Sequence, residues 1–502
     1  MRILTLHSIF IVILFHSSPL KSQVAYEYII GNSNDQEVFN DIAINEDGFV
    51  FALMSSTPID KYDSKTSSVI YKFSPDGDTI RYNPQKPDTI ISLRRIILTN
   101  HGNFIVAGDG YLSKKKSNSG LNMLNDSLEI YDFEWFCEFT SDFDVVWEKS
   151  YHLFDSAYTG PAVIKAKADS GYYYMASVVS ELKLKTNVYV YLFEFGSDGD
   201  SIAFSIFPKS MTSQIFSATI DEDNPNLLIH QVNTVIGSPY PCRMVEFNAS
   251  LDSVSSYTYP SQLFSKPFYT IMTNNKKFVS AGWDYTGFEE HIGVIKFDTT
   301  NGLIKKTLLT PGDKGVETAW VRTMDNYHPE LHFVTGIYNR QIVNVEPNWI
   351  YVAALNNNLD LIHEEYYGGD YCYDTWAISA TPDGGAVIAG RIDFLDVPGM
   401  ETYDAYILKL DSMMFVGLED KLSEKETDIK VYPNPATSRL FLEISESFSQ
   451  LKIYNLYGKL VQSEDISTGT HELNIKHLPC GVYSWVLSNS KNAMKSGLFI
   501  KN

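Results

Sequence analysis

Cysteine and basic residues are both scarce in this sequence, and each shortage limits what the protein can be. The chain has 4 cysteines in 502 residues, without paired or metal-like spacing, so we expect unpaired cysteines buried in a core. Lys and Arg total 40 against 61 Asp and Glu, which gives a formal net charge of −21. Such a chain repels a phosphate backbone, so we expect no nucleic-acid partner.

Long apolar runs are missing too, apart from one short run at the N-terminus. Apolar residues continue from Ile9 to Phe15, after Arg2 and before a polar stretch that ends in Ser22 and Gln23. A membrane span needs ~20 apolar residues, so this run is too short to cross a bilayer. The pattern predicts a secretory signal peptide over residues 1–22, and we expect no transmembrane segment in the mature chain.

Catalytic signatures are also absent from the sequence. It contains no G-x-S-x-G nucleophile elbow, no H-E-x-x-H metal site and no phosphate-binding G-x-x-x-x-G-K-[ST] loop. The sequence therefore identifies no catalytic residue, no cofactor or cofactor-binding residue and no metal ligand. The two carboxylates of a glycosidase can come from distant segments and then form no local sequence motif. We therefore keep an enzyme as the less favoured alternative. Residues 368–376, "GGDYCYDTW", hold aromatic and acidic groups of the kind that bind sugars, although alternation along a strand explains them as well.

What the chain has in abundance is 32 Tyr and 29 Phe, residues that suit half-buried β-strands. It also has an internal repeat. Each copy ends a strand on a large apolar residue and continues into Asp, Asn and Gly residues typical of a tight hairpin turn. Seven copies occur: "YKFSPDGD" at Tyr71, "CEFTSDFD" at Cys137, "FEFGSDGD" at Phe193, "VEFNASLD" at Val245, "IKFDTTNG" at Ile295, "AALNNNLD" at Ala353 and "LKLDSMMF" at Leu408.

A further strand precedes each copy by about 25 to 30 residues, so each repeat supplies about four strands. Seven four-stranded sheets arranged radially predict an all-β fold, a seven-bladed β-propeller over residues 23–418. A linear β-solenoid is the alternative. Several upstream strands end in a small pair with glycine, as in "IVAG" and "VIAG", which we interpret as places where neighbouring sheets approach closely.

The two ends of the repeat region suggest how the ring closes. The copy at Leu408 is followed by no strand of its own, whereas residues 24–30 form a predicted strand with no partner. We therefore predict that residues 24–30 complete the seventh sheet and leave no unpaired edge there.

A smaller unit follows the repeats. Residues 419–429 have the charged, aromatic-free composition of a linker, and residues 430–502 alternate as short strands that predict a β-sandwich. Three motifs occur in this unit in order: Y-P-N-P, I-Y-N-x-x-G-K and L-P-x-G-V-Y. The residues that carry them are Tyr432, Pro433, Asn434, Pro435, Gly458, Lys459, Gly481 and Tyr483.

The order of these motifs and the basic last strand resemble the type A C-terminal sorting domain of the type IX secretion system of Bacteroidetes. The resemblance implies export through the periplasm to the cell surface or the medium. It also implies two partners, the outer-membrane translocon and a sortase-like protease that removes the tail within residues 419–428. For the repeats we predict a non-catalytic binding module for an extracellular glycan or protein, with a secreted glycan-degrading enzyme, a hydrolase or lyase, as the alternative.

Overall fold

The computed structural model describes most residues between 24 and 501, and in this part every regular element is a β-strand. Residues 1–23, with the expected signal peptide, lie outside it, as do Cys242, Cys480 and the linker residues 419–428. The other segments left out are residues 33, 60–65, 85–88, 114–129, 152–156, 168–170, 181–186, 208–212, 221–225, 234–241, 259–265, 274–276, 287–288, 300–301, 310–314, 329–330, 341–345, 394–401, 412–418, 434–435, 445–447, 456–459, 489–493 and 502.

The described strands before residue 411 form seven antiparallel sheets, each built largely from consecutive strands. The first four sheets are β2(Asp35–Ile44), β3(Val50–Pro58), β4(Ser67–Phe73), β5(Thr79–Tyr82); β6(Thr89–Leu98), β7(Phe104–Ser113), β8(Ile130–Phe139), β9(Val145–Tyr151); β10(Ala157–Ala166), β11(Tyr172–Ser180), β12(Asn187–Phe195), β13(Ser201–Phe207); and β14(Ser213–Ile220), β15(Leu227–Asn233), β16(Arg243–Phe247), β17(Ser253–Thr258). The other three are β18(Lys266–Met272), β19(Phe278–Thr286), β20(Glu289–Asp298), β21(Gly302–Leu309); β22(Val316–Thr318), β23(Met324–His328), β24(Leu331–Tyr338), β25(Trp349–Asn356), β26(Leu361–Gly368); and β27(Cys372–Ala380), β28(Ala386–Asp393), β29(Tyr403–Leu410), β1(Val24–Ile30).

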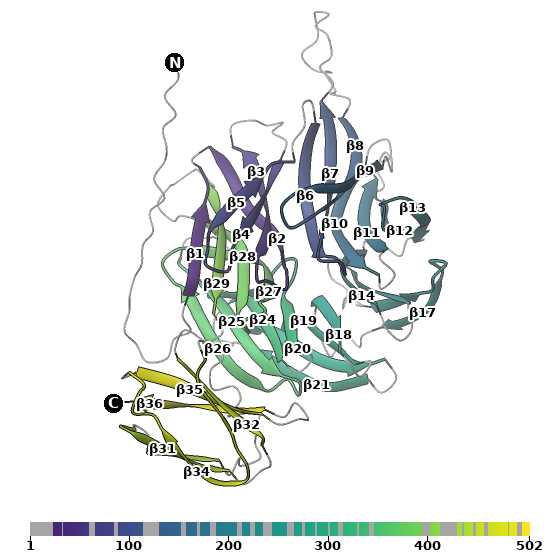
Figure 1. The fold of residues 1–502 in the computed structure, drawn as a ribbon. Helices are drawn as coiled ribbons and strands as arrows, with labels where there is room; N and C mark the ends of the chain where they lie inside the picture. Colours follow the sequence, from purple (N-terminus) through teal and green to yellow (C-terminus); the bar gives the residue numbers. More distant parts are fainter. Residues whose placement is uncertain are drawn as a thin grey trace, which may run out of the picture.

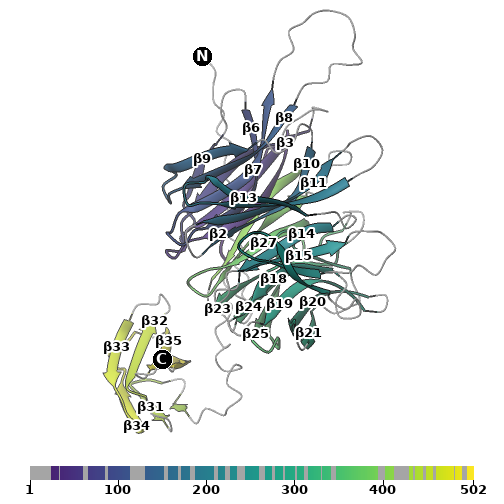
Figure 2. The same ribbon diagram turned by 90° about the vertical axis from the view of Figure 1, so that its right-hand side faces the viewer.

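The first strands of these sheets lie next to one another around a common axis. In order, β2 contacts β6, β6 contacts β10, and the series continues through β14, β18, β23 and β27 back to β2. Figure 1 shows the sheets following one another around the molecule, and Figure 2 shows β2 beside β27. The fold is therefore all-β and propeller-like.

The N-terminal strand closes the last sheet, as the sequence predicts. β1 pairs antiparallel with β29, from Val24 opposite Leu410 to Ile30 opposite Ala405. Tyr26 of β1 lies in one buried cluster with Phe39 and Phe73 of the first sheet, and this cluster also contains apolar side chains from one face of β28 and β29. The two ends of the repeat region are thus joined by main-chain pairing and by a shared core.

The repeated hairpin turns are also confirmed. In five copies the turn closes through the same two backbone hydrogen bonds, as between Ser74 and Asp78 and between Gly77 and Ser74. The seventh residue of the copy has a left-handed backbone, with φ of 97° at Gly77 but 60° at Leu251 and 59° at Leu359. The two leucines are fully buried, so their packing offsets a strained conformation that glycine adopts freely.

The first strand carries a β-bulge opposite the second strand in six of the described sheets. This corrects the interpretation of the small glycine pairs. A Cβ at Gly108 would run into the backbone of Ser92 and Leu93, and one at Gly390 into that of Asp374 and Thr375. These glycines therefore make room for the bulged first strand of their own sheet rather than for a neighbouring sheet.

The bulged strands are linked to the next sheet by side chains that accept backbone N–H groups. Asp41 accepts from the Ile96 amide at 3.1 Å, Ser217 from Thr270 at 3.0 Å and Asp325 from Ala380 at 2.9 Å. Each bond satisfies a main-chain donor on the first strand of a sheet, at the edge nearest the axis, where no further strand pairs. Three of the junctions between neighbouring sheets, first to second, fourth to fifth and sixth to seventh, are thus held by polar contacts as well as by apolar packing.

The sixth sheet has five strands because its first strand is broken into β22 and β23, both paired with β24. Within the break, the Val321 amide donates to the Trp376 carbonyl at 2.8 Å and the Ile378 amide donates to the Arg322 carbonyl at 3.0 Å. The broken segment therefore directs its main chain to the neighbouring strand β27 and carries Arg322 toward the axis.

The C-terminal unit consists of two antiparallel sheets around one apolar cluster. The first contains β30(Lys430–Tyr432), β31(Arg439–Ile444) and β34(Gly469–Asn474), and the second β33(Leu460–Asp465), β32(Gln450–Asn455), β35(Gly481–Ser488) and β36(Met494–Lys501). Leu440, Leu473, Ile453 and Phe499 are fully buried between them. No helix long and apolar enough to cross a membrane occurs in the residues that the structure covers.

Candidate functional site

The connections at the two ends of the strands differ in length. Each first strand turns into the second through a short turn at one end of the strands. In the first six sheets the third strand turns into the fourth at the same end, whereas in the seventh sheet the fourth strand is the N-terminal β1. The connections from the second to the third strand all lie at the opposite end of the strands, which we call the loop-bearing face. They span residues 59–66, 114–129, 181–186, 234–242, 287–288, 339–348 and 394–402. Connections that vary in length on a rigid scaffold are where ligand sites are usually found.

A buried carboxylate of the sixth sheet lies at this face. Glu317 of β22 is 4% exposed, and its Oε2 lies 2.5 Å from Nε of Arg340, which follows β24. The Arg340 guanidinium in turn lies over the ring of Trp283, 5.9 Å from its centroid. Among the described residues, Oε1 of Glu317 has no hydrogen-bond partner, which leaves this acid with one unsatisfied oxygen.

A second carboxylate, from the seventh sheet, has a similar environment. Asp374 of β27 accepts a hydrogen bond from Nε1 of Trp320 at 3.0 Å and pairs with Nε of Arg391 at 3.0 Å. The Arg391 guanidinium lies over the ring of Tyr403, 4.2 Å from its centroid. Trp320 is 39% exposed and packs edge-on against Phe268, so an indole face is offered to solvent beside the ion pairs.

The two acids influence one another electrostatically. Burial raises the pKa of Glu317 to about 8, with smaller contributions from Asp374 and Glu290, and Arg340 and Arg391 oppose the rise. Burial likewise raises the pKa of Asp374, although Arg391 and the Trp320 indole oppose it. A pKa this far above the ordinary value gives Glu317 access to its protonated form, in which a carboxyl group can donate a hydrogen bond or a proton. We call Glu317, Arg340, Asp374, Arg391 and Trp320 the rim cluster.

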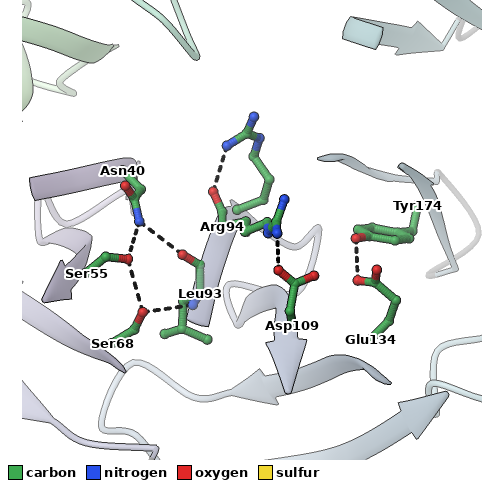
Figure 3. A network of polar contacts seen from close by, with 9 residues as sticks. Asn40, Ser55, Ser68, Leu93, Arg94, Asp109, Glu134 and Tyr174 are labelled. Atoms are coloured by element: carbon green, nitrogen blue, oxygen red, sulfur yellow. Dashed lines mark hydrogen bonds and ion pairs between the residues drawn. The ribbon is translucent and has the colours of Figure 1, made fainter. Parts of the chain in front are cut away.

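The second sheet repeats the pairing of an arginine and a carboxylate between its first two strands. Arg94, in the bulge of β6, pairs with Asp109 of β7, and nearby the Tyr174 hydroxyl donates to Glu134 at 2.6 Å. Figure 3 shows these four side chains beside the polar network of Asn40. Burial and the Glu134 charge raise the pKa of Tyr174 well above its ordinary value, so its phenol stays protonated and donates. An internal ion pair here satisfies groups that lack solvent.

Sequence reasoning located only part of the rim cluster. The stretch 368–376 was identified as aromatic and acidic, and Asp374 lies in the cluster while Tyr373 packs inward, 4% exposed. Glu317, Arg340 and Arg391 were not identified. Their pairs form across strands of one sheet, so no short motif contains both partners.

Two of the four cysteines, Cys137 and Cys372, lie within the described residues. Both are buried, as expected. Burial raises the pKa of Cys372 to about 11, so this thiol is a poor nucleophile. Among the described residues, no three His, Cys, Asp or Glu side chains gather in a way that suits a metal ion.

The sorting motif residues take different places in the tail. Tyr432 is 41% exposed, stacks on Phe441 and donates its hydroxyl to Glu443 at 2.9 Å, and Pro433 beside it is exposed. Gly481 begins β35 opposite Lys501. Tyr483 is buried, stacks on Phe499 and donates to the Pro479 carbonyl at 2.8 Å. The remaining four lie outside the described residues: Asn434, Pro435, Gly458 and Lys459.

Solved structures similar to this chain have low sequence identity and low structural similarity. PorZ, an essential surface component of the type IX secretion system of Porphyromonas gingivalis, is 10% identical with a TM-score of 0.34, over 92% of this chain and 70% of that chain. A subtype N11 neuraminidase-like protein of a flat-faced bat strain is 9% identical with a TM-score of 0.37, over 64% of this chain and 89% of that chain. The polysaccharide lyase Uly1 is 8% identical with a TM-score of 0.44, over 75% of this chain and 90% of that chain. No curated protein matches this sequence.

The family comparison concerns the tail. The model of the secretion system C-terminal sorting domain matches residues 430–501, which contain the three motifs and both sheets of the C-terminal unit. This match confirms the resemblance on which export was predicted. Residues 430–501 are thus a type IX C-terminal sorting domain, and the protein is one that this system exports to the cell surface or the medium.

Proposed function

We propose that the exported part of the chain is a seven-bladed β-propeller over residues 23–418 that binds an extracellular glycan or protein ligand on its loop-bearing face. Seven sheets whose first strands contact one another in a closed series support this reading. So does the pairing of β1 with β29, because a ring closed by both ends of the chain leaves no free edge at the join. We also propose that the binding module is not catalytic.

The proposal includes how the protein is processed. A signal peptide over residues 1–22 directs the chain to the periplasm of a member of the Bacteroidetes. The C-terminal unit, a β-sandwich over residues 430–502, then binds the type IX translocon. A sortase-like protease cuts within residues 419–428 of the linker, which spans residues 419–429, and releases the propeller or attaches it to the surface.

The observation that carries the binding function is the composition of the rim cluster. An exposed indole, two arginines and two carboxyl groups occur together at the face with the longest connections. Aromatic faces and paired charges of this kind hold sugar rings and polar peptide groups. Because Trp320 is fixed by its bond to Asp374, it presents its ring to a ligand without first losing conformational freedom.

Binding can be tested by screening the purified full-length chain against an array of glycans and against surface proteins of the native host. Replacing Trp320 with Ala should weaken the strongest binding at least tenfold, since this removes the exposed aromatic surface. The matched control is Phe204→Ala, which removes a ring that is 47% exposed on the outer strand β13. Equal binding by both variants would refute the proposed site.

A glycan-degrading enzyme is the second candidate, and the rim cluster is the observation that favours it. Glu317 has a pKa of about 8 and an unsatisfied oxygen, so it can act as a general acid, and Asp374 is the second carboxyl group. Turnover of a polysaccharide that is lost in Glu317→Gln and kept in Glu290→Gln would establish this activity. Binding without turnover would leave the non-catalytic module.

A further inference from the structure

A cavity of about 230 Å³ lies on the axis where the first strands of all seven sheets meet. Its walls include side chains of β2, β6, β10, β14, β18, β23 and β27, together with Val321 and Arg322 from the break in the sixth sheet. Five charged residues line it: Asp41, Arg95, Lys165, Arg322 and Asp325. The cavity is separate from the rim cluster, because none of the five residues of that cluster lines it.

The two carboxylates of the cavity are already satisfied by the protein. Asp41 accepts the Ile42 and Ile96 amides at 3.0 and 3.1 Å and pairs with Nη2 of Arg322 at 3.2 Å. Asp325 accepts the Asn326 and Ala380 amides, both at 2.9 Å, and the Ser379 hydroxyl at 2.8 Å. These carboxylates hold the sheets together and have little capacity left for a ligand.

The arginines have donors left over. A guanidinium has five N–H groups. Within the part of the chain that the structure describes, those of Arg95 make one hydrogen bond to protein, from Nη1 to the Arg94 carbonyl at 2.7 Å. Arg322 donates from Nη2 to Asp41, and its Nε is buried without a hydrogen-bond partner among the residues that the structure covers. The side chains of Asn40, Ser55 and Ser68, drawn in Figure 3, form a separate network with the main chain of Leu93 and leave the guanidinium groups unoccupied.

The charges do not balance. Two arginines and a lysine face two carboxylates, so the cavity holds one positive charge in excess, inside a chain whose net charge is −21. Burial lowers the pKa of Arg95, and the nearby charges of Arg94 and Arg322 add to this effect while Asp41 opposes it. A bound anion would compensate the unpaired charge.

Size and shape restrict the anion. The cavity exceeds the ~150 Å³ of an engineered site that holds benzene, yet it is smaller than the ~300 Å³ at which drug-sized pockets begin. The planar guanidinium binds a carboxylate through two parallel hydrogen bonds. We propose that the axial cavity binds one small organic carboxylate, such as a uronic acid that is free or forms the acidic end of a glycan, with Arg95 and Arg322 on its carboxylate and Lys165 beside it.

The test is calorimetry with the full-length chain and four probes: glucuronate, a glucuronate-terminated disaccharide, acetate and neutral glucose. We expect saturable binding of the carboxylates and none of glucose. Arg95→Met, which keeps the volume and removes the charge, should weaken carboxylate binding at least tenfold. Arg439→Met, an exposed arginine of the sorting domain, should leave it unchanged.

The probes separate the sources of the carboxylate. Tighter binding of the disaccharide than of glucuronate assigns the acidic end of a glycan, and the reverse order assigns a free acid. Should Arg95→Met fail to fold, Lys165→Met is the substitute, because Lys165 is half-buried and its loss leaves the buried Asp41 pair intact. Absence of binding by any carboxylate, or binding that neither variant weakens, overturns the inference.

This site does not depend on the function proposed for the rim cluster. Glycan binding that needs Trp320 but neither Arg95 nor Lys165 would leave the rim site standing and remove the axial one. Carboxylate binding that needs Arg95 but not Trp320 would support the axial site and give no support to the rim site.

Discussion

The Tyr28 hydroxyl donates a hydrogen bond of 2.7 Å to the Gly77 carbonyl, and this bond joins the N-terminal strand to the hairpin turn of the first sheet. The same relation recurs along the chain. Tyr151 of β9 donates to the Gly199 carbonyl at 2.6 Å, and Thr307 of β21 to the Leu359 carbonyl at 2.6 Å. In each case an outer strand holds the turn of the next sheet. β1 is therefore the outer strand of the seventh sheet. Its bond to the first sheet is the same one that other outer strands make to the sheet that follows them.

Removing this contact should loosen the closure. We expect Tyr28→Phe to lower the free energy of unfolding by about 1 kcal/mol, since one hydrogen bond is lost and the carbonyl stays partly buried. Deleting residues 24–30 should cost far more, because β29 then becomes an unpaired edge. Urea unfolding monitored by tryptophan fluorescence measures both. Tyr432→Phe, which removes an exposed hydrogen bond in the tail, is the control, and equal effects of Tyr28→Phe and Tyr432→Phe would count against the closure.

The glycines opposite the bulges should not tolerate a side chain. Gly390→Ala should destabilise the protein by about 2 kcal/mol or more, because its Cβ would overlap the Asp374 carbonyl. Gly102→Ala is the matched comparison. Its Cβ meets no atom within 4 Å, and the cost is limited to the left-handed backbone, with φ of 81°, or about 1 kcal/mol. Thermal unfolding of the two variants should rank Gly390→Ala as clearly the less stable.

The sequence predicted those parts of the fold that rest on local signals. Alternating strands, turns with Asp, Asn and Gly, and the unpaired strand of residues 24–30 are each visible in a short window. The bulges were missed because the sequence of a strand with one extra residue resembles that of any other strand. The axial cavity was also missed. Its ion pair joins Arg322 to Asp41, 281 residues apart, and only the closed arrangement brings the two together.

The pH dependence of stability should report on Glu317. Its pKa in the folded protein is about 8, against 4.5 for the ordinary group, so the folded state binds more protons between these values. Stability should therefore fall by a few kcal/mol as the pH rises from 4.5 to 8, and this part of the loss should be complete above pH 8. In Glu317→Gln that part of the slope should disappear.

A second acid contributes to the same profile. Burial raises the pKa of Glu37 to about 7, with Asp404 and Asp35 adding to the rise and Asn32 opposing it. Glu37→Gln should therefore flatten the profile mainly below pH 7 and Glu317→Gln up to pH 8. Unfolding midpoints in urea at pH 5, 6, 7, 8 and 9 distinguish the two, and a wild-type profile without slope in this range would contradict both assignments.

Two tyrosines of the sorting motif should differ in how they affect export. Tyr483 is buried against Phe499, so Tyr483→Ala should cost about 3 to 5 kcal/mol and unfold the tail. Tyr432 is 41% exposed, so Tyr432→Ala should leave the tail folded. If the translocon recognises the exposed motif, both variants should accumulate in the periplasm. Export of Tyr432→Ala at the wild-type level would mean that the fold of the tail, not this side chain, is what is recognised.

The central claim, that the tail is an address for export and the ring is its cargo, is tested most directly by mass spectrometry of the protein recovered from the medium and outer membrane of its native host. We predict a mature chain that starts near Gln23, just before β1, and ends between residues 419 and 428. A chain found only inside the cell, or one at the surface that still ends at Asn502, would contradict this account.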